Sequence, residues 1–287
     1  MRIHSKDFRA EPHGKFKLSE WSTKVKPFYA DKDDYKKRLA DHNDELSAQQ
    51  DLFYANHCYS LLIIFQAMDA GGKDSAIEHV MSGVNPQGCN VTSFKHPSEE
   101  ELDHDFLWRC TEKLPKRGMI GIFNRSYYEE VLITRVHPKI LKAENLPPSL
   151  THEKDIWKGR FKSITDFESH LHRNATRVVK IFLHLSKEEQ KHRFLKRIDH
   201  AEKNWKFAVG DIEERKYWNE YQRVYGDCIR ETTAPHAPWY VVPADDKPNA
   251  RLIVAQIILD ALRGFELTPP SATKEQKKAL AEMRKKL

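Results

Sequence analysis

A glycine loop with a lysine and two aspartates is the first group of residues whose types and spacing suggest chemistry. It directly follows an unbroken apolar run, SLLIIFQA at Ser60–Ala67, and helical spacing of apolar residues begins at Ala76. Such a run is typical of a strand buried on both faces. A glycine loop between a buried strand and a helix offers backbone N–H groups to phosphate oxygens, and a lysine adds positive charge. We predict that phosphate is bound by Ala70, Gly71, Gly72, Lys73, Asp74 and Ser75.

The loop departs from the usual phosphate-loop pattern G-x-x-x-x-G-K-[ST] at two positions. Ala67 replaces the first glycine, and Asp74 replaces the hydroxyl residue, so that Ser75 offers a hydroxyl one position late. Carboxylates beside a phosphate repel it unless Mg²⁺ lies between them, which predicts Asp69 as a metal ligand. Asp74 fits equally well as a carboxylate that complements the helix dipole. For the loop as a whole, the alternative is an ordinary turn with a solvated Lys73.

A second polar cluster follows the apolar segment 119–123, at Asn124 and Arg125. Ligands bind parallel sheets at the carboxyl ends of the strands. Asn124 occupies the position of a metal-supporting aspartate in many phosphate-loop enzymes, and Arg125 can hold a phosphate through two hydrogen bonds. We expect Glu129 and Arg135 to face an acceptor nucleotide or each other. The alternative is an ordinary salt-bridged start of a helix.

Residues 191–207 combine clustered basic side chains with two aromatic ones. In nucleotide kinases, a basic segment of this kind folds over the reacting phosphates and excludes water. A solvated basic helix face is the alternative. Asp211 is predicted either as the N-cap of the following helix or as a further metal carboxylate. The basic residues proposed to contact phosphates are Arg193, Lys196, Arg197, Lys203 and Lys206.

The alternation of apolar strands with amphipathic helices predicts an α/β fold in which a parallel five-stranded sheet is covered by helices on both faces. We expect a lead-in segment at 1–50, a domain at 51–267 with a lid at about 190–212, and a basic tail at 268–287. Of the net charge of +6, residues 177–210 carry nine cations and four acids (+5), and 274–287 carry six and two (+4), which leaves −3 elsewhere. The positive charge is therefore local, and it indicates a polyanionic ligand.

Composition excludes several classes of protein. No apolar run reaches the roughly 20 residues that a membrane span needs, and the N-terminus has no apolar signal region. The four cysteines show no C-x-x-C spacing, which argues against a structural zinc site or a disulfide framework. We therefore expect a cytoplasmic protein with reduced thiols and no protein-held transition metal.

These features together resemble the polyphosphate kinase 2 family over residues 50–264, most of the chain. The resemblance implies a P-loop kinase fold with a helical lid, related to thymidylate kinase, and phosphoryl transfer between inorganic polyphosphate and nucleotides. The matching motifs are Gln66-Ala67-Met68-Asp69-Ala70-Gly71-Gly72-Lys73-Asp74, Gly83-Val84-Asn85-Pro86-Gln87-Gly88, Phe123-Asn124-Arg125-Ser126, Asn204-Trp205-Lys206-Phe207 with Gly210-Asp211, and Ala237-Pro238-Trp239-Tyr240.

Carried over to this sequence, the active-site residues of the family are Asp69, Lys73, Asn124, Arg125, Arg197 and Asp211. Mg²⁺, or Mn²⁺ in its place, is expected at Asp69 and Asp211. The Asn-Arg-Ser-x-Tyr-Glu form, with Glu129, resembles the class III subgroup, which accepts both nucleoside mono- and diphosphates. The resemblance also implies a homodimer or homotetramer.

Three alternatives remain open from the sequence. An enzyme restricted to diphosphates would usually carry Asp at position 124. An ATP-dependent nucleotide kinase shares the fold, but the missing first glycine and the long basic surface disfavour it. A nucleic-acid-binding protein would explain the basic charge but not the paired aspartates beside a glycine loop. We expect polyphosphate and nucleotides as partners, and neither nucleic acid nor membrane.

Overall fold

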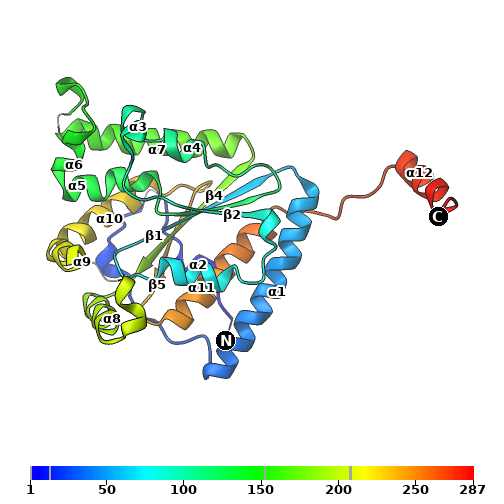
Figure 1. Cartoon of the computed structure of the whole chain (residues 1–287), viewed down its shortest axis with the longest axis horizontal. Coiled ribbons are helices and arrows are strands. Elements are labelled where there is room, and N and C mark those ends of the chain that lie inside the picture. Colours follow the sequence, from blue (N-terminus) through cyan, green and yellow to red (C-terminus); the bar gives the residue numbers. More distant parts are fainter. Residues whose placement is uncertain (1, 13, 152, 207–208) are drawn as a thin grey trace.

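The computed structural model describes residues 2–12, 14–151, 153–206 and 209–287, and for 153–155, 206 and 209 only the backbone. A five-stranded, fully parallel sheet forms its centre, in the order β2-β3-β1-β4-β5 (Figure 1). This confirms the predicted fold class. The strands are β1 (Ser60–Ala67), β2 (Cys89–Ser93), β3 (Ile120–Asn124), β4 (Thr176–His184) and β5 (Trp239–Pro243).

The central strand β1 is buried along all eight residues, as its unbroken apolar run predicts. It pairs with β3 on one side and β4 on the other, so that Ile63 lies between Ile122 and Val179. In this register the carboxyl ends of β1 and β3 lie side by side, because Phe65 pairs with Asn124. The glycine loop and the Asn124 cluster therefore meet at one edge of the sheet.

Helices cover both faces of the sheet (Figure 1). One face carries α1 (Lys32–Asn56), α2 (Lys73–Val80) and α11 (Lys247–Arg263), which contact one another. The other carries α7 (Glu153–Arg173) and α10 (Trp218–Thr232). The predicted lid consists of α8 (Lys187–Asp199), a 3-10 helix at Ala201–Lys206 and α9 (Val209–Glu214). The remaining α-helices are α3 (Glu99–Asp103), α4 (Trp108–Thr111), α5 (Ile133–Val136), α6 (Pro138–Ala143) and α12 (Lys274–Arg284).

Two helical regions of the chain are interrupted. The helix that begins with the Ser98–Glu101 capping box ends at Asp103, because the carboxylate of Asp105 accepts a hydrogen bond from the N–H of Leu107 (2.9 Å) and forms a local turn. A 3-10 turn at Arg215–Tyr217 separates α9 from α10. Asp211 lies inside α9, so its interpretation as an N-cap is wrong.

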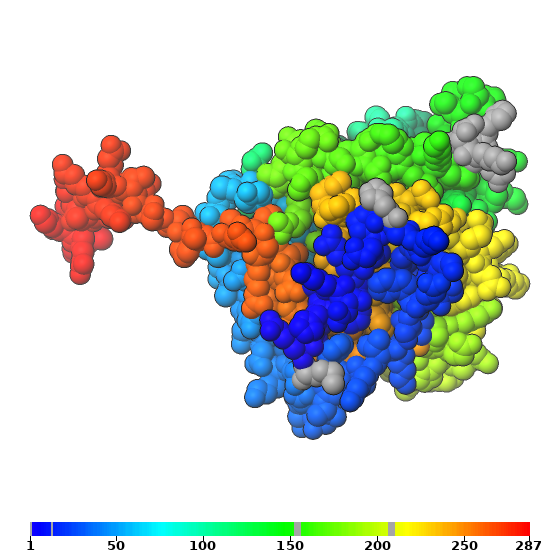
Figure 2. Space-filling view, turned by 180° about the vertical axis from the view of Figure 1, so that it is seen from behind, coloured from blue at the N-terminus to red at the C-terminus, as the bar shows by residue number. Residues whose placement is uncertain are grey.

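The N-terminal segment belongs to the same core as the rest of the chain. The side chains of Phe8, Ala10 and Leu18 are buried in it, and the N–H of Ala10 donates to the carbonyl of Trp239 (2.9 Å). The boundary expected at residue 51 falls inside α1. Figure 2 shows this segment against the body, whereas the tail that carries α12 projects away from it. Within the described residues, we find no helix with the length and apolar character needed to cross a membrane.

Candidate active site

A cavity of about 560 Å³ lies at the carboxyl edge of the sheet. Its walls come from the segments after β1, β2, β3 and β5 and from the lid, so that distant parts of the sequence converge there. The lining residues are Asp69, Ala70, Gly71, Gly72, Lys73, Asp74, Ser75, Ser93, Phe94, Lys95, Asn124, Arg125, Arg193, Lys196, Arg197, Lys203, Asp211 and Lys247. The cavity thus brings together nearly all the residues predicted from the sequence.

The glycine loop is shaped by close packing and left-handed backbone angles. Ala70 and Gly72 have φ values of 58° and 95°. A Cβ on Gly71 would lie 2.4 Å from the Cβ of Ala67 and 2.7 Å from the carbonyl oxygen of Met68, so only glycine fits there. The loop therefore turns tightly from β1 into α2, with Lys73 as the first helical residue.

Arg193 braces this loop from the lid helix α8. Its guanidinium is buried and donates to the carbonyl oxygens of Ala70 and Gly71 (both 3.0 Å) and to that of Ala244, while its Nε donates to Glu189 (2.7 Å). These bonds engage every nitrogen of the guanidinium within the protein. The expectation that Arg193 binds polyphosphate is therefore corrected: it holds the loop in place instead.

Lys73 is half-buried at the base of the cavity, where its ammonium donates to the carbonyl oxygen of Ala67 (2.9 Å). Desolvation lowers its pKa, and the nearby charge of Arg125 lowers it further. The carboxylates of Asp69, Glu129 and Asp74 oppose this shift. An anionic ligand in the cavity would favour the charged form of Lys73.

Two contacts join the glycine loop to the end of β3. The amide of Asn124 donates to Asp74 (2.5 Å), and the guanidinium of Arg125 lies 3.5 Å from the carboxylate of Asp69. Arg125 itself has a left-handed backbone, with φ 65°. Burial would lower the pKa of Arg125, but the charges of Glu129 and Asp69 outweigh burial and raise it. Asp74 therefore links two elements as well as lying near a helix N-terminus.

The lid supplies the roof of the cavity. Arg197 lies 3.4 Å from the carboxylate of Asp211 and also over the ring of Phe194. Lys196 and Lys203 line the same space. The side chain of Lys206 lies outside the described residues. The hydroxyl of Ser75, on the opposite wall, accepts a hydrogen bond from Arg251.

Two predicted residues lie outside this cavity. Glu129 lines a smaller adjoining cavity of about 70 Å³ with Asp69 and Arg125, so it lies beside the phosphate site. Arg135 lies elsewhere: it pairs with Asp227 (3.0 Å) and packs against Trp157 and Phe161. The expectation that Arg135 faces the nucleotide or Glu129 is therefore wrong, because α10 and α7 surround its side chain.

Four lining residues were not predicted from the sequence: Ser93, Phe94, Lys95 and Lys247. All four lie at or after the carboxyl end of a strand. Ser93 ends β2, and Phe94 and Lys95 follow it directly. Lys247 lies after β5, at the start of α11. Ligands bind at the ends of parallel strands, so the residues after every strand, not only after β1 and β3, are candidates.

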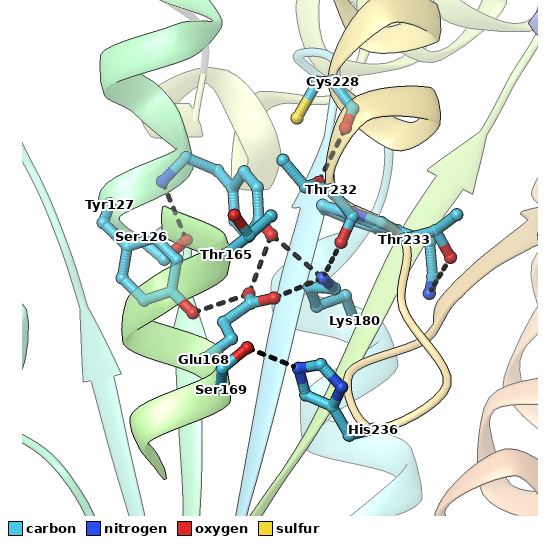
Figure 3. A network of polar contacts seen from close by, with 12 residues as sticks. Ser126, Tyr127, Thr165, Glu168, Ser169, Lys180, Cys228, Thr232, Thr233 and His236 are labelled. Atoms are coloured by element: carbon cyan, nitrogen blue, oxygen red, sulfur yellow. Dashed lines mark hydrogen bonds and ion pairs between the residues drawn. The ribbon is translucent and has the colours of Figure 1, made fainter. Parts of the chain in front are cut away.

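Behind the segment that follows Arg125 lies a buried polar network (Figure 3). The hydroxyls of Tyr127 and Tyr128 donate to one carboxylate oxygen of Glu168 (2.9 and 2.8 Å), and Lys180 donates to the other (2.6 Å). Desolvation raises the pKa of both tyrosines well above the usual value. The side chains of Tyr127 and Tyr128 are therefore held in place by hydrogen bonds from their neutral hydroxyls to the Glu168–Lys180 ion pair.

The cavity also offers carboxylates for a metal. Asp69, Asp74 and Asp211 line it, but the described residues contain no group of three or more His, Cys, Asp or Glu side chains arranged to hold an ion. Mg²⁺ suits such a site, because it takes one or two protein carboxylates and completes its shell with phosphate oxygens and water. The donor set therefore fits a metal that arrives with phosphate rather than one held in a protein cage.

Comparison with known proteins identifies close relatives of the whole chain. Residues 29–268 match the family model described as polyphosphate kinase 2. An ADP-polyphosphate phosphotransferase of Rhodopseudomonas palustris is 54% identical over 100% of this chain and 99% of its own, and an AMP/ADP-polyphosphate phosphotransferase of Meiothermus ruber is 39% identical over 96% and 100%. The crystal structure of polyphosphate kinase 2 from Arthrobacter aurescens TC1 superposes with a TM-score of 0.86 at 37% identity, covering 97% of this chain and 96% of that one. The chain therefore belongs to the polyphosphate kinase 2 family.

Proposed function

We propose that this protein is a polyphosphate-dependent nucleotide kinase that transfers phosphoryl groups between inorganic polyphosphate and nucleoside mono- and diphosphates, AMP and ADP above all. The observation that carries the proposal is the charge of the cavity. Eight cationic side chains line it against three carboxylates, around a glycine loop built to hold phosphate. A site with a net charge of 8 − 3 = +5 suits two polyanionic substrates at once. The names of the relatives support this substrate pair.

In this proposal, Lys73 and the loop N–H groups hold the phosphates at the reacting centre, while Arg125 and Arg197 neutralise charge on the transferred group. The attacking phosphate oxygen is already anionic at neutral pH, so the protein needs no strong general base. The closed lid excludes water, which strengthens each of these interactions. Catalysis then consists of positioning and electrostatic stabilisation.

Asp69 and Asp211 would hold Mg²⁺, or Mn²⁺ in its place, beside the phosphates. The bound ion would supply positive charge that neutralises the reacting phosphates. These two carboxylates lie near Arg125 and Arg197, at 3.5 and 3.4 Å, so each one has a cation beside it. Each pair would separate or be shared when phosphate enters, because the arginines have a second anion to bind.

The choice of acceptor separates two versions of the proposal. Asn124, rather than Asp, favours an enzyme that accepts both AMP and ADP. The relative that is 54% identical bears a name that mentions ADP alone, which favours the version restricted to diphosphates. The relative that is 39% identical is named for both.

The deciding experiment incubates the purified protein with long-chain polyphosphate, Mg²⁺ and either AMP or ADP, and measures ADP and ATP by chromatography. Formation of both products from AMP supports the first version, and turnover of ADP alone supports the second. If ATP is the only effective donor, an ordinary nucleotide kinase explains the site better. The expected dimer or tetramer stays a prediction, which light scattering of the same preparation tests.

A further inference from the structure

Lys247 lies in the cavity on the side opposite the Asn124 cluster. It is the first residue of α11, separated from the end of β5 by the three residues 244–246, and hydrogen bonds fix the backbone just before and after it. The N–H of Asp245 donates to the carbonyl of Thr23 (3.0 Å), and the carboxylate of Asp246 caps the helix by accepting from the N–H of Asn249 (3.2 Å). The side chain of Lys247 therefore projects from a rigid turn.

Within the described residues, the ammonium of Lys247 has no hydrogen-bond acceptor and no ion pair. The charged groups around it are mostly cations: Arg193 and Lys196 come from α8 and Arg251 from α11, and Glu189 is the carboxylate among them. Arg193 is committed to the glycine loop and Arg251 to Ser75. Arg193 is also paired with Glu189. Lys196 and Lys247 are therefore the members of this cluster that have no hydrogen-bond or ion-pair partner among the residues described. Cations that the protein does not neutralise form a site for an anion.

The strand order shows how the cations of the cavity are arranged along the carboxyl edge of the sheet. Lys95 follows β2, Arg125 follows β3, the glycine loop follows β1, and Lys247 follows β5 at the far edge of the sheet. Cations thus line the carboxyl edge from one side of the sheet to the other, and neighbouring strands lie about 4.8 Å apart. From β3 to β5 the row spans about 14 Å.

We propose that Lys247 binds the polyphosphate chain on the β5 side of the glycine loop, while the nucleotide occupies the β3 side near Asn124 and Glu129. This inference rests on the proposed function and adds an orientation to it. On the β3 side, the carboxylates of Asp69 and Asp74 lie beside Arg125 and offer acceptors to the hydrogen-bond donors of a nucleotide. The β5 side offers cations, which suit a chain of phosphates.

The same geometry makes polyphosphate binding sensitive to pH. Desolvation and the charges of Arg193, Arg251 and Lys196 lower the pKa of Lys247 to about 8, and Glu189 opposes the shift. The protonated form binds the anion, so the contribution of Lys247 is present below pH 8 and is lost as the pH rises above it. An arginine in its place would stay charged over this range.

The test measures KM for long-chain polyphosphate and for ADP with the wild type, Lys247→Met and Lys247→Arg, from pH 6.5 to 9.5. At pH 7 we expect Lys247→Met to raise KM for polyphosphate about tenfold, the size of one charge-assisted hydrogen bond, and to change KM for ADP less than twofold. Above pH 8 the wild type should approach Lys247→Met, whereas Lys247→Arg keeps its low KM. Lys191→Met, which removes an exposed lysine of α8 outside the cavity, is the matched control and should behave as the wild type.

Three results would overturn this inference while leaving the proposed function intact, because wild-type turnover would still be present. They are an unchanged KM for polyphosphate in Lys247→Met, an equal rise in both KM values, and parallel pH profiles for the wild type and Lys247→Arg. A wild type that does not use polyphosphate at all would overturn the proposed function and this inference together.

Discussion

Lys180, which is fully buried, and Lys73, which is half-buried, show how differently the protein treats the same side chain. Lys180, on β4, donates to Glu168 (2.6 Å), to the hydroxyl of Tyr128 (3.0 Å) and to the carbonyl of Thr232 (2.7 Å). Lys73 donates to the carbonyl of Ala67, and it borders an open cavity. Burial lowers the pKa of both.

The two lysines differ in whether the protein or a ligand supplies the hydrogen-bond acceptors for the ammonium group. An ammonium has three N–H donors. Around Lys180 the protein satisfies all three, and the resulting network is closed, as Figure 3 shows. Around Lys73, the part of the chain that the structure describes supplies one acceptor, and the other two donors are available to a ligand. The first lysine should therefore matter for stability and the second for activity, and the following variants test that division.

The largest effect is expected from Lys180→Met, which leaves the carboxylate of Glu168 buried without its cation. Loss of one partner of a buried pair costs about 3–5 kcal/mol of unfolding free energy. Chemical denaturation followed by circular dichroism measures the loss. The double variant Lys180→Met/Glu168→Gln removes the unpaired charge and should recover part of it. A single variant as stable as the wild type would show that the network does not hold the core.

Lys73→Met should instead leave the stability of the fold unchanged and strongly reduce the rate of phosphoryl transfer. Loss of one preorganised positive group at a site of developing charge lowers kcat by about 10²–10³-fold. Steady-state formation of ATP from ADP and polyphosphate measures kcat, and thermal unfolding checks the fold. Near-normal turnover in this variant would contradict the assignment of the glycine loop.

Arg193 and Arg197, one helical turn apart on α8, repeat the comparison within the site. Arg193→Met would leave the carbonyls of Ala70 and Gly71 unpaired, so we expect a loss of about 2 kcal/mol in unfolding free energy together with reduced turnover. Arg197→Met should reduce turnover with little change in stability, because its guanidinium is partly exposed beside Asp211. Equal stability of the two variants would argue against the bracing role.

The smallest effect distinguishes the two tyrosines of the network. The hydroxyl of Tyr128 contacts both Glu168 and Lys180, whereas that of Tyr127 contacts Glu168. Tyr128→Phe should therefore cost about 1–2 kcal/mol and Tyr127→Phe less, as measured by urea denaturation at pH 7. The reverse order would show that Lys180 does not need the hydroxyl.

Much of the site was accessible from the sequence because its signals are local. The glycine loop, the strand ends and the basic lid are continuous segments whose spacing predicts both their structure and their chemistry. The role of Arg193 could not be predicted, because its acceptors lie more than fifty residues away at Ala244 and more than a hundred away at Ala70. Arg135 was misplaced for the same reason: its partner Asp227 belongs to another helix.

The sequence by itself determined the parallel α/β fold, the phosphate loop and the concentration of positive charge in the lid and the tail. These depend on hydrophobic periodicity and on residue types within short windows. Only the tertiary structure decided which cationic side chains are paired within the protein and which are available to bind a ligand. Arg193 and Lys180 are satisfied by distant carbonyls and carboxylates, whereas Lys73 and Lys247 face the cavity, and that distinction arises when the strand ends are brought together by folding.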